Sequence, residues 1–364
     1  MRSAPTPRPG VPAGRRCRSR EPVRIAIVSD IHANLAAFEA VLAHARSVGY
    51  DSMVCLGDVV GYGPDPVECV DLVREHCEWT LLGNHDFAAV YEPTNFNTVA
   101  AKAVFWTRAQ TLEGEWLRRR IAELQQARDE DRISDAEFLD RKCGAEVEQR
   151  ERVDFMFRIS PRRILLDRYV CVHASPSRPV NEYLFPNDVE ANPKRLERNF
   201  GLLTLPGPDG DRRVSAIVGH THCPGFILEA PPDPVEIARV EAEHARTHGE
   251  GAAPSLLEMA RARIPRRYEF EAFPVGADTW TPNDDEMPEG CRFILNPGSV
   301  GQPRDGDPRA SYAMLEVGEN GARDRFVFHR VAYDIGRTQS RLRAYMAAGA
   351  PLDDWLAERL ERGQ

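Results

Sequence analysis

The chain has 364 residues, of which 42% are hydrophobic and 28% are charged, and its formal net charge at pH 7 is −9. This length exceeds an average domain without requiring two domains, and the acidic balance disfavours a protein whose main task is to grip a nucleic acid backbone. No apolar stretch reaches the length of a membrane-spanning helix, so we expect no membrane partner.

Residues 1–22 are rich in Arg, Pro and Gly and lack the apolar stretch that a secretory signal needs. We interpret this segment as a disordered basic leader, with a nucleic-acid-binding arm as the alternative. The eight cysteines include no Cys-x-x-Cys pair, and Cys55 and Cys171 lie in apolar runs, so a reducing, cytoplasmic setting fits them best.

The first part of the chain alternates between strand and helix patterns. Strands are predicted over 23–28, 53–56 and 79–82, and helices over 35–48 and 66–76. Asn34 is the expected N-cap of the first helix, and Gly49 is expected to end it. This order is typical of strands joined by crossover helices, which deliver ligands at the carboxyl ends of the strands.

Further strands are expected as a hairpin over 164–166 and 169–172, then at 214–218, 226–228, 293–295, 312–316 and 326–331, the last four antiparallel. Two segments interrupt this series, at about 111–158 and 229–288. The first has helical apolar spacing and predicts a protruding helical hairpin, which is a solvated decoration, a lid or an oligomer contact. The second includes a helical part at 235–248, and two short helices at 337–348 and 352–362 end the chain. Together these elements predict two packed sheets with helices outside.

Five strand ends carry side chains that bind metals: Ser29-Asp30-Ile31-His32, Gly57-Asp58, Gly83-Asn84-His85-Asp86, Val172-His173 and Gly219-His220-Thr221-His222. Each alone could be a structural turn. Together they supply Asp, His and Asn without thiolate, which is the ligand mix of a hydrolytic site for Mn, Fe, Zn or Co. Two such ions close together form a clamp for in-line displacement at phosphorus. The set therefore predicts a phosphoester hydrolase.

These motifs, in this order, resemble those of the calcineurin-like metallophosphoesterase superfamily, and in particular its small prokaryotic phosphodiesterase and phosphatase branch. The stretches 57–64, 181–184 and 296–305 add to the likeness. The resemblance implies an α/β fold, a four-layer αββα sandwich of two mixed β-sheets flanked by helices. Here it would span residues 23–335, with helical insertions at about 111–158 and 229–288, and C-terminal helices would occupy 336–364.

The resemblance also implies two divalent metal ions as cofactors, with Mn, Fe, Zn, Ni and Co all open as their identity. One ion would be held by Asp30, His32 and His222 and the other by Asn84, His173 and His220, while Asp58 would bridge both. A bridging hydroxide would be the nucleophile. His85 would be catalytic rather than a ligand, either protonating the leaving oxygen or stabilising developing charge.

Some interpretations stay open. Asp86 either caps a helix or holds an imidazole, and the loop at 296–305 is either a turn beside the site or the source of two substrate contacts, Asn296 and Arg304. Residues 59–63 lack the Asp and Arg that protein Ser/Thr phosphatases of the superfamily carry after Gly-Asp, which disfavours a phosphoprotein substrate.

We therefore expect a small-molecule or nucleotide phosphoester as the substrate. The alternatives are a protein phosphatase, a catalytically silent scaffold or a nuclease. A nuclease would need a basic groove, for which the leader and Arg261, Arg263, Arg266 and Arg267 are the only hints. The sequence predicts no oligomeric state.

Overall fold

A computed structural model describes residues 22–364 apart from 209, 231–232, 249–256, 258, 260–263, 265, 284–285, 289–290 and 319–321. The predicted basic leader therefore lies outside the described residues except for its last residue, and so do Arg261 and Arg263.

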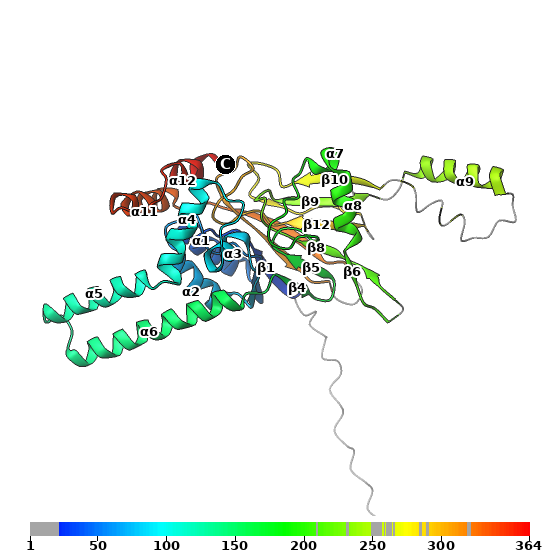
Figure 1. Cartoon of the computed structure of the whole chain (residues 1–364). Helices are drawn as coiled ribbons and strands as arrows, with labels where there is room; N and C mark the ends of the chain where they lie inside the picture. Colours follow the sequence, from blue (N-terminus) through cyan, green and yellow to red (C-terminus); the bar gives the residue numbers. More distant parts are fainter. Residues whose placement is uncertain are drawn as a thin grey trace, which may run out of the picture.

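Two six-stranded sheets form the centre of the molecule (Figure 1). The first sheet has the order β11-β14-β13-β1-β2-β3, with bounds Thr279–Trp280, Arg325–Val331, Ala310–Glu316, Arg24–Val28, Ser52–Cys55 and Trp79–Thr80. The second has the order β10-β9-β12-β8-β5-β4, with bounds Arg267–Ala272, Gly225–Ala230, Arg292–Asn296, Ser215–Ile217, Tyr169–Val172 and Arg162–Leu165. A separate pair joins β6 (Thr204–Leu205) to β7 (Arg212–Arg213).

Both sheets are mixed. In the first sheet β1, β2 and β3 are parallel, whereas β1 is antiparallel to β13. In the second sheet β5, β8 and β12 are parallel, and β12 is antiparallel to β9. The predicted hairpin is present as β4 and β5, paired in antiparallel fashion.

Alternating side chains divide the interior into layers. In β1, Ile25 and Ile27 point into the core between the sheets, while Ala26 and Val28 belong to the core under the helices of the first sheet. In β12, Leu295 faces the core between the sheets, and Ile294 faces the helices of the second sheet. Because successive side chains of a strand point to opposite faces, three apolar cores separate four layers. The predicted αββα sandwich is confirmed.

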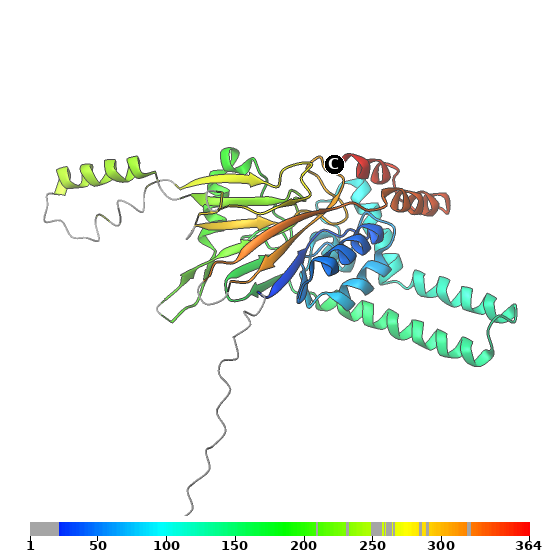
Figure 2. The same ribbon diagram turned by 180° about the vertical axis from the view of Figure 1, so that it is seen from behind.

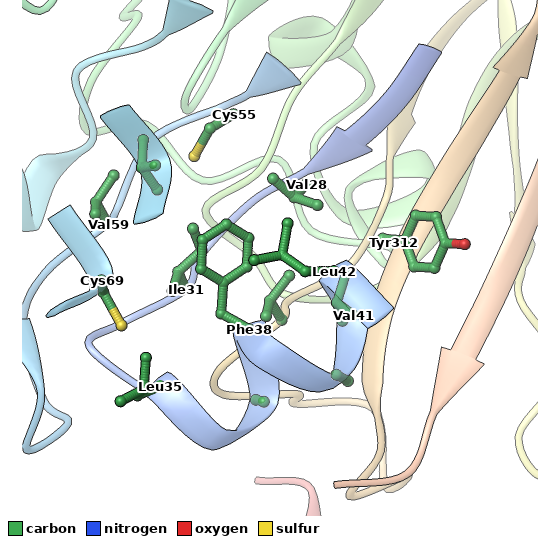
Figure 3. Close-up of a cluster of buried hydrophobic side chains, with 14 of the residues drawn as sticks. Val28, Ile31, Leu35, Phe38, Val41, Leu42, Cys55, Val59, Cys69 and Tyr312 are labelled. Atoms are coloured by element: carbon green, nitrogen blue, oxygen red, sulfur yellow. The ribbon is translucent and has the colours of Figure 1, made fainter. Parts of the chain in front are cut away.

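Helices α1 (Leu35–Val48) and α2 (Pro66–His76) cover the outer face of the first sheet, as Figure 2 shows from behind. Asn34 accepts a hydrogen bond from the Ala37 N–H, so it caps α1 as predicted. The buried ring of Phe38 lies beside Val28 and Ile31, with Val41 and Leu42 in the same cluster (Figure 3). Helices α7 (Asp188–Ala191) and α8 (Pro193–Gly201) accompany the second sheet.

The segment after α3 (Asn84–Val90) and α4 (Thr98–Thr111) forms two paired helices, α5 (Glu115–Asp129) and α6 (Asp135–Arg158), that project from the body of the molecule (Figure 1). Arg152 anchors α6 to α2: its side chain is 2% exposed, and its Nε and Nη2 each lie 2.7 Å from an oxygen of Asp71.

The remaining helices are α9 (Pro234–His248), α11 (Ile335–Ala347) and α12 (Trp355–Glu358). The last predicted helix is corrected: it begins at Trp355 rather than at residue 352 and continues as a 3₁₀ turn, Arg359–Arg362. Among the described residues, no helix is both long and apolar enough to cross a membrane.

Candidate active site

The seven predicted ligands come from loops that follow strands of both sheets. Asp30 and His32 follow β1, Asp58 follows β2, and Asn84 begins α3 just after β3. His173 follows β5, and His220 and His222 follow β8. Since β1, β2 and β3 are parallel, and so are β5 and β8, these loops gather at one edge of the sandwich.

The ligand atoms form two buried groups with one member in common. Asp30, His32, Asp58 and His222 make up one group, and Asp58, His173 and His220 the other, with ligand atoms inside each group within 4.8 Å of one another. Asp58 Oδ2 lies 3.6 Å from His32 Nε2 and 3.4 Å from His173 Nε2. Asn84 adjoins the second group, since its Oδ1 is 3.2 Å from His173 Nε2.

Backbone carbonyls fix the tautomers of three imidazoles. Nδ1 of His32 lies 3.3 Å from the Val60 oxygen, Nδ1 of His173 lies 2.9 Å from the Leu56 oxygen, and Nδ1 of His222 contacts the Gln302 oxygen. A carbonyl can only accept, so each Nδ1 carries the proton and each Nε2 is left to act as a ligand.

The donor set fits bound cations. His32 Nε2 and His222 Nε2 face each other at 3.1 Å with both protons placed on Nδ1, so two lone pairs meet in a buried space. His220 Nε2 is also buried and has no hydrogen-bond partner among the described residues. A divalent ion would satisfy both arrangements, because neutral imidazole is a common metal ligand.

The charges of the cluster favour the same conclusion. Burial lowers the pKa of His32, His220 and His222, which favours the neutral form of these rings. Burial alone would raise the pKa of Asp30 and Asp58, but the neighbouring histidines hold both carboxyls well below their usual range. Although burial opposes it, Asp58 raises the pKa of His173 to about 9, so a cation there would displace a proton.

The backbone at five of these positions is left-handed. The φ angles are 54° at Asp30, 50° at His32, 52° at Asp58, 68° at His220 and 62° at His222. Non-glycine residues rarely adopt such values, and they cluster at functional sites where the surrounding structure imposes them.

His85 lies beside the two ligand groups and belongs to neither of them. Its backbone N–H donates to Asp58 Oδ1 at 2.8 Å, and its ring is in contact with His32, Tyr62 and Phe96 at centroid distances of 4.8, 4.3 and 4.8 Å. The ring is 3% exposed, and its Nδ1 has no partner among the described residues. Burial lowers its pKa to about 4, against the opposing charge of Asp58.

Two glycines let the loops of the site approach one another. A Cβ on Gly83 would lie 2.1 Å from Asp58 Oδ1 and 2.2 Å from its backbone nitrogen, and a Cβ on Gly61 would lie 2.3 Å from His85 Nδ1. Real Cβ atoms do not come so close, so both positions require glycine.

Asp86 closes the start of α3. Its carboxylate accepts from the Gly83 N–H at 3.1 Å and from the Val60 N–H at 3.2 Å. Of the two interpretations left open, the structure selects capping. The same contacts join the loop after Asp58 to the helix that carries Asn84 and His85.

Asn296 and Arg304 differ in how they meet the site. The Asn296 amide donates to the Gly219 oxygen at 2.6 Å and to Thr221 Oγ1 at 2.9 Å, and its oxygen accepts from the Gly298 N–H, so it holds the loop of His220 and His222. The charge of Arg304 contributes to the lowered pKa values of His32, His85 and His222. Its Nε is buried without a hydrogen-bond partner among the described residues.

Arg359 packs near Tyr62, whose ring contacts His32 and His85, and the sequence pattern does not reveal it. It is 7% exposed, and its guanidinium lies 5.7 Å from the ring centre of Tyr62 and 4.3 Å from that of Trp355. Burial and the charge of Arg304 lower its pKa to about 10. Tyr183 also has no place in the pattern of metal ligands, yet its ring stacks on His220 at 3.8 Å. The likeness of the stretch 181–184 to the family is the only sequence signal for Tyr183. Neither Tyr183 nor Arg359 lies at a spacing typical of metal ligands.

Comparisons with known proteins agree with this geometry. The sequence model of the family described as calcineurin-like phosphoesterase matches residues 23–224. The uncharacterised protein MJ0912 of Methanocaldococcus jannaschii is 28% identical over 343 residues, which cover 93% of this chain and 98% of that protein. The crystal structure of a metallophosphoesterase from Sphaerobacter thermophilus is 30% identical with a TM-score of 0.57, and the match covers 94% of this chain and all of that one.

The family match extends over more than half of the chain and includes every predicted ligand, from Asp30 to His222. The solved relative has the same fold along nearly the whole length. The chain therefore belongs to the calcineurin-like phosphoesterase family and is a metal-dependent phosphoester hydrolase.

Proposed function

We propose that the protein hydrolyses a phosphodiester or phosphomonoester of a small molecule or nucleotide, with two divalent ions bound. The observation that carries the proposal is the position of Asp58, which is common to both groups of ligand atoms. A carboxylate has two charged oxygens and can hold two cations close together.

Asp30, His32 and His222 would hold one ion, and Asn84, His173 and His220 the other, with Asp58 between them. When bound, such ions lower the pKa of a water molecule and neutralise charge on the phosphate. The identity of the ions, among Mn, Fe, Zn, Ni and Co, stays open, because oxygen and imidazole ligands suit all of these metals.

The other residues of the site would act on the phosphate and on the leaving group. His85 would donate an N–H to the leaving oxygen, since its ring lies next to the ligand groups and is in contact with His32. Arg304 and Arg359 would bind the non-bridging oxygens, because guanidinium groups match phosphate geometry.

The choice of a small substrate rests on what surrounds the metal ligands. Val59 and Val60 are fully buried where protein phosphatases of the superfamily carry an acid and an arginine. One of the arginines that hinted at a basic groove, Arg266, lies 3.9 Å from Glu229, which gives it an acidic partner and weakens the case for a nuclease. The described cysteines are unpaired, in keeping with the proposed cytoplasmic setting.

Metal analysis combined with turnover tests the proposal. We expect purified protein, reconstituted with Mn, Zn, Ni or Co, to hydrolyse bis(p-nitrophenyl) phosphate or p-nitrophenyl phosphate. Asp58→Asn should lose that activity, and Asp154→Asn, on the projecting helix α6, should keep it. Fewer than about one metal ion per chain after reconstitution, with no turnover of either ester, would favour the silent scaffold.

A further inference from the structure

A cavity of about 330 Å³ opens beside the ligand groups and is lined by Asn84, His85 and His220. Its other walls come from the segment between α3 and α4, at residues 92–97, and from the segment at 180–183 that follows His173. Its size is at the lower end of small-molecule pockets, which measure roughly 300–1,000 Å³.

The chemistry of this cavity is aromatic and amide-rich. The rings of Tyr62, Phe87, Phe96 and Tyr183 line it together with the amides of Asn95, Asn97 and Asn181. None of its described lining residues is Lys or Arg, and Glu92 is the one charged residue among them. Such a wall presents no cationic side chain of its own for a second phosphate and suits an uncharged, flat group with hydrogen-bonding edges.

The walls are held in place without a ligand. Tyr183 stacks on His220 at 3.8 Å and on Phe185 at 4.9 Å, with interplanar angles of 23° and 3°. The preceding residue, Glu182, accepts from Ser175 Oγ at 2.6 Å and from Asn199 Nδ2 at 3.1 Å, which fixes the segment. A preformed pocket loses little entropy when a ligand binds.

Two of the amides are available to a ligand. Asn97 Oδ1 is occupied, because it accepts from the Ala100 N–H at 2.8 Å at the start of α4. The side chains of Asn95 and Asn181 form no hydrogen bond with any described residue, although both line the cavity. A side-chain amide offers a donor and an acceptor side by side, as the edge of a nucleobase does.

The position of His85 indicates which part of the ester would enter the cavity. In an in-line displacement the leaving oxygen departs opposite the attacking oxygen, next to the group that donates to it. His85 is that donor in the proposed function, and it lines the cavity. The cavity therefore lies on the side of the leaving alcohol, whereas Arg304 and Arg359 do not line it.

We infer that this cavity binds the uncharged nitrogen heterocycle of the leaving alcohol, so that the substrate is a nucleotide ester whose nucleoside departs. The inference rests on the proposed function for the direction of departure. The recognition of the base rests on the aromatic rings and on the amides of Asn95 and Asn181.

Binding of a nucleoside without phosphate tests the inference independently of turnover. Saturation-transfer NMR and calorimetry should show that adenosine binds the wild-type protein and that ribose, which lacks the base, does not. The double variant Asn95→Gly/Asn181→Leu should weaken adenosine binding at least tenfold; residue 95 is changed to glycine because its backbone is left-handed, with φ 65°. Gln126→Leu, an amide replacement on the projecting helix α5, should leave it unchanged.

A second measurement separates recognition from folding. The double variant should hydrolyse p-nitrophenyl phosphate with kcat/KM within about threefold of the wild type, because its leaving group has no base edge. Absence of adenosine binding in a wild type that turns over aryl esters would overturn the inference and leave the proposed function standing. Adenosine binding without any turnover would overturn the proposed function and support the cavity as a base site. Equal adenosine affinity in the double variant and the wild type would overturn the assignment of the two amides.

Discussion

The two oxygens of Asp58 have separate tasks. Oδ2 faces His32 and His173, one from each ligand group, while Oδ1 accepts the backbone N–H of His85. One side chain thus sets the spacing of the two groups and the position of the proposed leaving-group donor. The neighbouring Gly83 leaves the space that the carboxylate occupies.

Gly83→Ala should therefore destroy activity while the chain still folds. The added Cβ would overlap the Asp58 carboxylate, and overpacking of this kind costs roughly 1–3 kcal/mol. We expect turnover of p-nitrophenyl esters to fall at least about 100-fold, with a lower free energy of unfolding in urea. Gly144→Ala is the matched control, because a Cβ there meets nothing within 4 Å inside α6. That variant should gain about 0.5–1 kcal/mol and keep full activity.

The two arginines at the site give a prediction about phosphate binding. Arg304→Gln and Arg359→Gln should each lower kcat/KM by about tenfold or more, since hydrogen bonds to charged groups contribute roughly 1.5–3 kcal/mol. Arg343→Gln serves as the control: its side chain is half exposed and lies 3.1 Å from Asp354. Steady-state kinetics with an aryl phosphodiester measures all three. Rates for the two site variants equal to that of Arg343→Gln would remove the arginines from the proposed phosphate site.

At the scale of single residues, the sequence predicted the candidate metal ligands better than the residues that surround them. Asp58 and His220 could be located because each follows an apolar strand with a side chain that binds metals. Asn296 could not be placed from sequence, since two of its three contacts are with a loop about 75 residues away along the chain. Arg359 gave no signal, because it reaches the site only through the packing of the C-terminal turn.

His329, a buried histidine in strand β14 of the first sheet, should make the stability of the fold depend on pH. His329 of β14 stacks on Tyr312 of β13 at 4.9 Å, and His44 of α1 lies 5.2 Å away. Neither ring nitrogen of His329 has a hydrogen-bond partner among the described residues. Burial, together with the charge of His44, lowers its pKa to about 4 from the ordinary 6.5, while Glu316 acts in the opposite direction.

The sign follows from proton linkage. Between pH 6.5 and 4 the unfolded chain binds a proton at His329 and the folded chain does not, so acid favours unfolding. His329→Phe should therefore lose less stability than the wild type as the pH falls from 7 to 4, and His76→Gln should behave as the wild type does. Urea unfolding at each pH measures this difference. Parallel curves for His329→Phe and the wild type would contradict the assignment.

Elements with strong periodicity were predictable, and several of the shortest ones were not. The bounds of α1 and α2 agree with the prediction to the residue, because Asn34 and Gly49 delimit the first and Pro66 begins the second. The strand predicted at 79–82 is present as the shorter β3, which pairs with β2, whereas the two-residue strand β11 depends on pairing with β14 rather than on any local pattern. The start of the last helix was placed too early for a similar reason, since Leu356 and Leu360 are fixed by packing against the rest of the molecule.

Across the whole molecule, the predicted metal ligands come from both sheets. Asp30, His32 and Asp58 extend from the first sheet, whereas His173, His220 and His222 extend from the second. Ions bound by residues of both sheets would therefore add bonds across the sandwich. An ion that binds only the folded state stabilises that state by about 2.7 kcal/mol when its concentration is 100 times its dissociation constant.

Thermal unfolding should reveal this coupling. We expect Mn²⁺ to raise the Tm of the wild type in a concentration-dependent way and a chelator to lower it. Asp58→Asn should respond less, because the residue shared by both groups loses its charge. A wild-type Tm that is indifferent to both additions would show that no ion joins the two sheets. Differential scanning calorimetry gives the measurement.

The left-handed backbone at the predicted ligands implies a conflict between the stability of the fold and its activity. A non-glycine residue in this conformation costs about 1–2 kcal/mol, and five ligand positions share it. His220→Gly would relieve the strain of the left-handed backbone and would also remove one predicted metal ligand. Selection for thermal stability alone, in the presence of a chelator, should therefore accumulate substitutions at these five positions. The resulting protein should be more stable and should no longer hydrolyse phosphoesters.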